Sequence, residues 1–162
     1  MKLRRVVGLL ASSVVALSAG CGGETPPGDA ETAQSSAPAQ TATLARTPSP
    51  AGARVFIISP INGETVSSPL EVKFGISGMA VAPAGDYAAD SGHHHLLVDA
   101  ELQDLSAPVP TSDNHLHFGK GQTETTLELS PGEHTLQLVL GDGNHIPHEP
   151  PVQSQRVTVT VQ

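Results

Sequence analysis

Aromatic residues and cysteine are scarce in this chain. Phe, Trp and Tyr together make up 2% of its 162 residues, and tryptophan is missing altogether. Sugar-binding surfaces usually present aromatic platforms, so this composition disfavours a glycan-binding protein. The single cysteine, Cys21, has no partner within the chain, which excludes an internal disulfide framework and a cysteine-based zinc finger.

Positive charge is also scarce. The chain has 8 Lys and Arg residues against 16 Asp and Glu residues, which gives a formal net charge of −8. Loss of an N-terminal segment that carries Lys2, Arg4 and Arg5 would change this charge to −11. So acidic a surface repels the phosphate backbone of nucleic acids, which excludes them as partners, and it attracts cations.

The N-terminal 20 residues have the features of an export signal. The basic stretch "MKLRR" precedes the short apolar stretch "VVGLLASSVVALSAG", so we expect a signal peptide over residues 1–20. The following "LSAGC" resembles a bacterial lipobox, although Ser18 stands where an aliphatic residue is usual. We expect lipidation of Cys21, with ordinary secretion as the alternative. The lipid would anchor the protein to a membrane of the bacterial cell envelope, facing the periplasm or the exterior, and Gly22 mildly favours the outer membrane.

Residues 21–52 are dominated by Pro, Ala, Ser, Thr and Gly without hydrophobic periodicity, so we expect a disordered linker after Cys21. Residues 53–162 are long enough for one hydrophobic core. Short segments of alternating apolar and polar residues, separated by turn signals, predict an all-β domain there, an antiparallel immunoglobulin-like β-sandwich. The expected strands are 53–59, 70–76, 94–100, 123–129, 134–141 and 154–161.

All eight histidines fall between residues 93 and 148. Side chains alternate faces along a strand, so His93 and His95 should share one face and His115 and His117 another. Such an H-x-H pair spaces two Cα atoms about 7 Å apart, which suits two ligands of one ion. In "GDGNHIPH", Pro147 stiffens the loop that carries His145 and His148.

Imidazole and carboxylate ligands suit Zn²⁺, Cu²⁺ or Ni²⁺, and we expect copper or zinc. The first-choice ligands are His93, His95, His117 and His145, with His148 next. Additional ligands or orienting partners could come from His94, His115, His134, Asp99, Asp142 and Glu124. Any one of these histidines, taken alone, is better explained as a structural residue, and the cluster without a metal would be a proton-sensitive patch.

Several segments resemble a bacterial family of small exported proteins, the domain of unknown function 4399 family. The resemblance covers about residues 55–162 and rests on "GMAVAPAG", "SGHHHLLVD", "HFGKGQTETTLEL", "PGEHTLQLVLGD" and "HIPHEPPV". It implies a compact envelope domain and supports the β fold, but it implies no activity or ligand set. The histidines in matching blocks are His93, His94, His95, His117, His134, His145 and His148.

Three classes of function remain open at this point. The first is a metal-binding envelope lipoprotein that is not an enzyme, and the second is an interaction module for a protein partner. The third is a copper-dependent redox enzyme, since "HLHFG" and "GDGNH" resemble loops of copper–zinc superoxide dismutases, although the disulfide of those enzymes is missing. The sequence contains no serine-centred nucleophile elbow, which disfavours a serine hydrolase.

Overall fold

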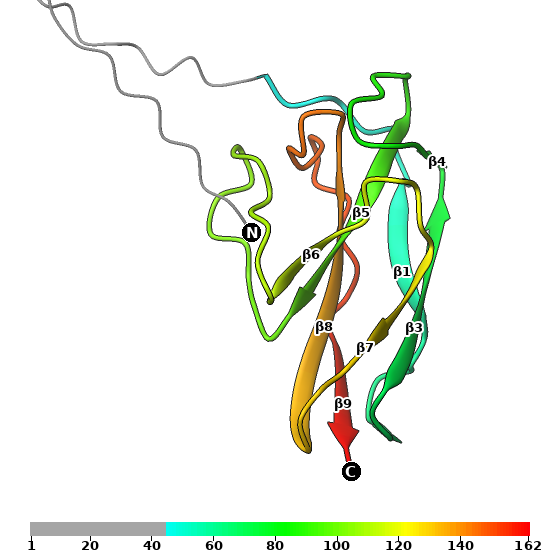
Figure 1. Ribbon diagram of the computed structural model, residues 1–162. Helices are drawn as coiled ribbons and strands as arrows, with labels where there is room; N and C mark the ends of the chain where they lie inside the picture. Colours follow the sequence, from blue (N-terminus) through cyan, green and yellow to red (C-terminus); the bar gives the residue numbers. More distant parts are fainter. Residues whose placement is uncertain (1–44) are drawn as a thin grey trace, which may run out of the picture. The chain divides into compact units, whose positions relative to one another are not determined.

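The computed structural model describes residues 45–162 (Figure 1). The expected signal peptide (1–20), Cys21 and most of the expected linker lie outside the described residues. Within the described part, no helix is long and apolar enough to cross a membrane.

The domain is built from two sheets that face each other (Figure 1). The smaller sheet has the strand order β1-β3-β7, and the larger one has the order β2-β9-β8-β5-β4, with β6 also paired to β5. The pairs β2–β9 and β4–β5 are parallel and the others are antiparallel. The strands are β1 Arg54–Ser59, β2 Glu64–Val66, β3 Leu70–Ser77, β4 Ala80–Val81, β5 Ser91–Val98, β6 His115–His117, β7 Glu124–Leu127, β8 Gly132–Gly141 and β9 Val157–Val161.

The main core lies between the two sheets and follows the alternation of the strands. In β3, the side chains of Val72 and Phe74 are buried, whereas Glu71 is exposed. Leu96 in β5 and Leu138 in β8 meet them from the larger sheet. The all-β sandwich expected from the sequence is therefore confirmed, and the period-2 pattern is the physical reason that it was predictable.

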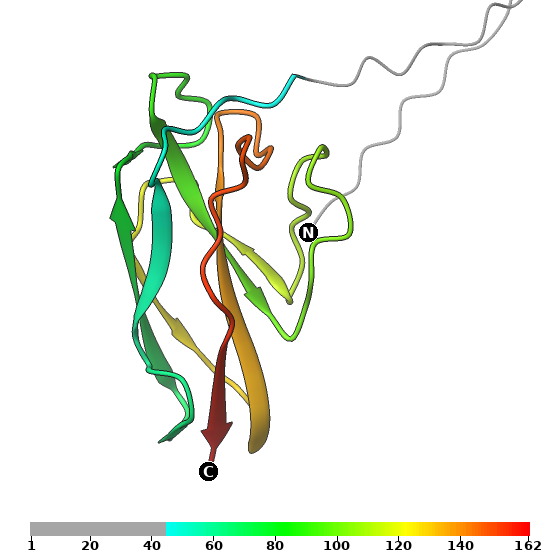
Figure 2. The same ribbon diagram turned by 180° about the vertical axis from the view of Figure 1, so that it is seen from behind.

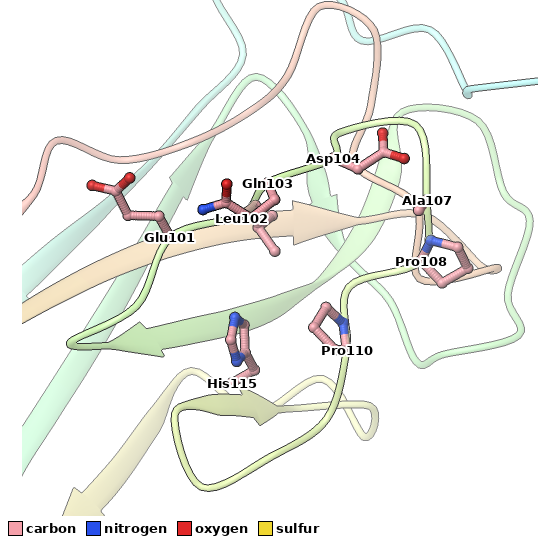
Figure 3. A pocket seen from close by; sticks show the side chains of 8 residues that line it. All are labelled: Glu101, Leu102, Gln103, Asp104, Ala107, Pro108, Pro110 and His115. Carbon is pink, nitrogen blue, oxygen red and sulfur yellow. The ribbon is translucent and has the colours of Figure 1, made fainter.

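Strand β5 is unusual because every one of its residues is buried. Its inner face contributes Leu96 and Val98 to the main core, while Leu97 on its outer face packs with Val109 and Val139 in a second small core. Val109 belongs to the long connection between β5 and β6, which passes over β5 and β8 (Figure 3; the same sheet is seen from behind in Figure 2). Both faces of β5 are thus shielded from solvent.

The strand bounds differ from the sequence-based ones mainly around β5 and β9. Strand β5 ends at Val98, because Asp99 adopts a positive φ of 53° and turns the chain away from the sheet. The short strands β2 and β4 were not expected, since three residues or fewer give too little alternation to detect. Strand β6 carries His115 and His117, the H-x-H pair that the sequence analysis placed on a strand.

Candidate metal centre

The strand β5 places two imidazoles on the outer face of the larger sheet. Because successive side chains alternate, His93 and His95 point outward and His94 points into the main core against Phe74. The Nε2 atoms of His93 and His95 approach to 3.0 Å. Both rings belong to residues with 0% exposure. Two neighbouring imidazoles are therefore held in a place that water does not reach.

The third imidazole comes from the adjacent strand. In the antiparallel pair β5–β6, His117 lies directly opposite His95, and their ring centroids are 5.1 Å apart. The ligand nitrogens of His93, His95 and His117 all lie within 4.8 Å of one another. Pairing of an H-x-H strand with a histidine-bearing neighbour is enough to assemble this triad.

The fourth imidazole, that of His145, comes from the loop that follows β8. Its ring centroid lies 4.9 Å from that of His93 and 4.8 Å from that of His117. The loop is held by Asp142, whose backbone carbonyl accepts a hydrogen bond from the His145 amide and whose Oδ1 accepts bonds from the amides of Asn144 and Ile146. We call the four residues His93, His95, His117 and His145 the histidine cluster.

Loops cover the histidine cluster from outside the sheet. Segment 82–90 is tied to the neighbouring loops by hydrogen bonds from Ala84 N to Gly119 O, from Gly85 N to Gly143 O, and from Tyr87 Oη to Asn144 Oδ1. The long β5–β6 connection adds a bond from Val109 N to His145 O. Since His117 and His145 are only partly buried, solvent reaches the histidine cluster on their side.

Several ring nitrogens of the histidine cluster lack a hydrogen-bond partner in the described part of the chain. They are the Nδ1 atoms of His93 and His95 and the Nε2 atom of His117. A buried polar atom without a partner costs about 1–3 kcal/mol, so such an arrangement is retained only where something else is gained. Coordination of a metal by one nitrogen of each ring is the gain that this chemistry offers.

Burial and mutual repulsion keep these imidazoles neutral. Burial, together with the neighbouring His93 and His117, lowers the pKa of His95 to about 2. Burial, together with His145 and His117, lowers the pKa of His93 to about 4, although Asp142 opposes the shift. Burial also lowers the pKa of His117. A metal ion binds a neutral imidazole. Near neutral pH these rings are already neutral, so the metal does not have to displace a proton from a charged ring.

Two glycines make room for the rings. A Cβ atom at Gly119 would lie 2.4 Å from His117 Cε1, and one at Gly141 would lie 2.9 Å from His95 Nε2. The signal that could have identified their role is their position beside histidines on paired strands.

The substitution Gly119→Ala is expected to displace the His117 imidazole, because its new methyl group would overlap the ring. Metal affinity should fall at least tenfold, whereas the free energy of unfolding of the metal-free protein should change by about 1 kcal/mol or less, since the backbone at Gly119 needs no positive φ. Calorimetric titration and urea unfolding measure the two quantities. The variant Lys120→Ala, at the exposed neighbouring position, serves as the control and should bind metal as the unmodified protein does.

His148 and His94 lie away from the histidine cluster, although both are completely buried. A Cβ atom at Gly92 would lie 3.0 Å from both His148 Cε1 and Leu140 Cγ, which places His148 on the core face of the sheet with Leu140. His148 was the expected ligand next after the four first-choice histidines, but the structure separates its ring from those four. Its Nδ1 is 3.4 Å from Leu140 O, and its Nε2 has no partner among the described residues.

His94 occupies an apolar position in the main core. Its ring centroid is 5.4 Å from that of Phe74, and neither ring nitrogen makes a hydrogen bond of normal geometry. Burial lowers its pKa, and a nearby backbone group of Gln122 only partly opposes the shift. The middle histidine of "HHH" is thus a core residue, unlike its two neighbours.

Replacing this core histidine by leucine should therefore be tolerated. His94→Leu removes two unpartnered polar atoms and keeps most of the side-chain volume, so the free energy of unfolding should rise or fall by no more than about 1 kcal/mol. Metal affinity should stay unchanged because the side chain faces away from the histidine cluster. Denaturant unfolding and calorimetry check the two expectations, and a large loss of metal affinity would contradict the assignment of faces.

The remaining candidates lie at other places. His115 is half-buried, hydrogen-bonds Ser112 and lines a separate pocket of about 360 Å³ under the long β5–β6 connection (Figure 3). His134 pairs with Asp99 at 2.7 Å, which raises the pKa of His134. Glu124 is exposed on β7, in the other sheet, and is paired in register with Lys73.

Asp142 lies close to the histidine cluster but is fully engaged. In addition to the two amides of its own loop, it accepts a hydrogen bond at Oδ2 from Thr47 Oγ1 at 2.6 Å. Arg46 bonds the carbonyls of Pro147 and His148, so the segment that starts at Arg46 braces the same loop. No local sequence pattern marks Arg46 and Thr47, because their contacts join segments some 100 residues apart.

The chain is similar to proteins of one family. A family model described as "Domain of unknown function (DUF4399)" matches residues 72–162. Comparison with curated proteins found no match. Among solved structures, fibronectin(III)-like modules of Clostridium thermocellum CbhA show 13% identity over 66% of this chain and 92% of that chain, with a TM-score of 0.34. This structural likeness is too weak to carry any argument about function.

The family match confirms the resemblance noted in the sequence over most of its length. It covers more than half of the chain and includes the strands β5, β6 and β8. All eight histidines lie within it. The chain therefore belongs to the DUF4399 family.

Proposed function

We propose that this protein is a lipoprotein of the bacterial cell envelope whose β-sandwich domain binds one divalent transition-metal ion, copper or zinc. The observation that carries the proposal is the approach of three imidazoles from two paired strands, with their ligand nitrogens within 4.8 Å of one another. These rings are kept neutral by burial and lack other partners for several of their nitrogens. If these positions served only to fill space, apolar side chains would be more stable there, because burial of a polar group without a hydrogen bond costs free energy.

The most direct test is a titration of untagged, chelator-treated protein with Zn²⁺ and Cu²⁺ in a calorimeter. The proposal predicts one ion per chain and loss of binding by at least a hundredfold in the variant His95→Leu, which removes a central ring. His134→Ala is the matched control, because His134 is a histidine outside the histidine cluster, and its affinity should equal that of the unmodified protein. Absence of saturable binding, or equal binding by His95→Leu, would contradict the proposal.

The place of the protein in the cell is proposed from Cys21. Its thioether-linked lipid would hold the protein at the membrane surface, with the outer membrane preferred, and the acidic domain would meet cations there. Expression of the full chain in a bacterium with labelled palmitate tests this. Cys21→Ser should lose the label and move from the membrane to the soluble fraction, whereas a label that persists in this variant would contradict lipidation at Cys21.

A further inference from the structure

We infer that the histidine cluster is a closed tetrahedral site, in which His145 is the fourth ligand and no coordination position remains for a substrate. This inference rests on the metal binding proposed above and specifies the geometry and the kind of ion. Its basis is the arrangement of the four rings. The six distances between their centroids are 4.8, 5.0, 4.9, 5.1, 5.9 and 4.8 Å.

These distances describe a tetrahedron and exclude a plane. A square arrangement, which Cu²⁺ and Ni²⁺ prefer, would make the two diagonals about 1.4 times as long as the sides. Here the longest distance, 5.9 Å, is only about 1.2 times the shortest, 4.8 Å. Four imidazoles bound tetrahedrally to Zn²⁺ at about 2.0–2.1 Å would place their centroids about 5 Å apart. The rings therefore surround a volume of the size that one zinc ion with four nitrogen ligands requires.

The backbone at His145 supports its role as a ligand. His145 has a positive φ of 67°, a conformation that costs a residue with a side chain about 1 kcal/mol. Strain of this kind persists where the surroundings impose it, and here the bonds to Asp142 do so. His145 is outside the set of three whose nitrogens lie within 4.8 Å of one another. Its ring centroid lies 4.9, 5.9 and 4.8 Å from those of His93, His95 and His117, so ligation requires the side chain to rotate and turn a nitrogen toward them.

A closed site of this kind holds a metal and does not catalyse. Catalytic zinc sites keep one position open for water or substrate, whereas structural sites fill all four positions with protein ligands. Four neutral imidazoles leave the ion with its full positive charge, and the buried carboxylate of Asp142 is close enough to His93 to offset part of it. The site should thus favour ions that accept tetrahedral geometry, such as Zn²⁺ and Co²⁺, over the flat geometry of Cu²⁺.

Cobalt substitution tests the inference, because tetrahedral Co²⁺ absorbs visible light strongly and octahedral Co²⁺ absorbs weakly. The Co²⁺-loaded protein should show the strong spectrum, and neither azide nor free imidazole should change it. The variant His145→Gly should fold, since glycine accepts the positive φ, and should bind Co²⁺ at least tenfold more weakly. Its spectrum should shift on addition of free imidazole, which would occupy the vacated position. His115→Ala, on the same strand as His117, should behave as the unmodified protein.

Three results would overturn the inference while leaving metal binding intact. They are a weak octahedral spectrum, a shift of the unmodified protein's spectrum with azide, and a His145→Gly variant that matches the unmodified protein in affinity and spectrum. By contrast, failure of the unmodified protein to bind Zn²⁺ in the calorimeter would overturn the proposed function itself and the inference with it.

Discussion

Saturation with Zn²⁺ is expected to raise the free energy of unfolding of the metal-free protein by about 4 kcal/mol at a free ion concentration about 1,000 times the dissociation constant. The physical reason is that the histidine cluster exists only in the folded chain, where β5, β6 and the loop after β8 meet. For a domain of this size the midpoint of thermal unfolding should rise by roughly 15 °C. Differential scanning calorimetry with and without the ion measures the shift.

The same experiment has two informative controls. His95→Leu should show at most about a third of this shift at the same Zn²⁺ concentration, because it removes a ring that contacts three others and weakens binding at least a hundredfold. His94→Leu, one position away on the opposite face, should keep the full shift. If both variants lost the shift equally, the effect of the ion would not arise at the outer face of β5.

Acid is expected to destabilise the metal-free protein strongly below about pH 6.5. The pKa values of His93 and His95 are lowered from an ordinary 6.5 to about 4 and about 2 in the folded protein. At a pH between 6.5 and the lowered pKa of each group, that histidine is protonated in the unfolded chain but not in the folded protein. Stability from both groups is therefore complete above pH 6.5 and declines as the pH falls.

The slope approaches about 1.4 kcal/mol per pH unit for each histidine once the pH is well below 6.5, so roughly 3 kcal/mol should be lost between pH 6.5 and pH 5. That is a large part of the stability of an ordinary domain. Urea unfolding at several pH values measures it. The double variant His93→Gln with His95→Gln should lose most of the dependence, since glutamine does not titrate. A metal-free protein whose stability stayed constant down to pH 5 would show that these rings are not held neutral.

The sequence allowed the central part of the histidine cluster to be predicted. Strand alternation places His93 and His95 on one face and His94 on the other, whatever the rest of the fold. His117 was a candidate from its own H-x-H pattern, but its place opposite His95 depends on the pairing of β5 with β6, which the sequence pattern does not predict. The sandwich itself was predictable for the same reason, since Leu70, Val72 and Phe74 alternate with polar residues.

The loop after β8 could not be predicted in the same way. Alternation has no meaning in a turn, and the Asp142 hydrogen bonds direct His145 outward while the chain returns and places His148 inward beside Leu140. Pro147 stiffens this loop but does not decide the directions of the two rings. The contributions of Gly141 and Thr47 depend on contacts between distant segments, which no local pattern reveals.

The central claim is that one metal ion lies among the imidazoles of His93, His95, His117 and His145. Anomalous diffraction at the zinc absorption edge, from crystals of untagged protein loaded with Zn²⁺, tests it most directly. The account predicts a single strong peak about 2.0–2.1 Å from one nitrogen of each of the four rings. The claim would be contradicted if no anomalous peak lay among the four rings, or if the only peak lay elsewhere, such as between His134 and Asp99.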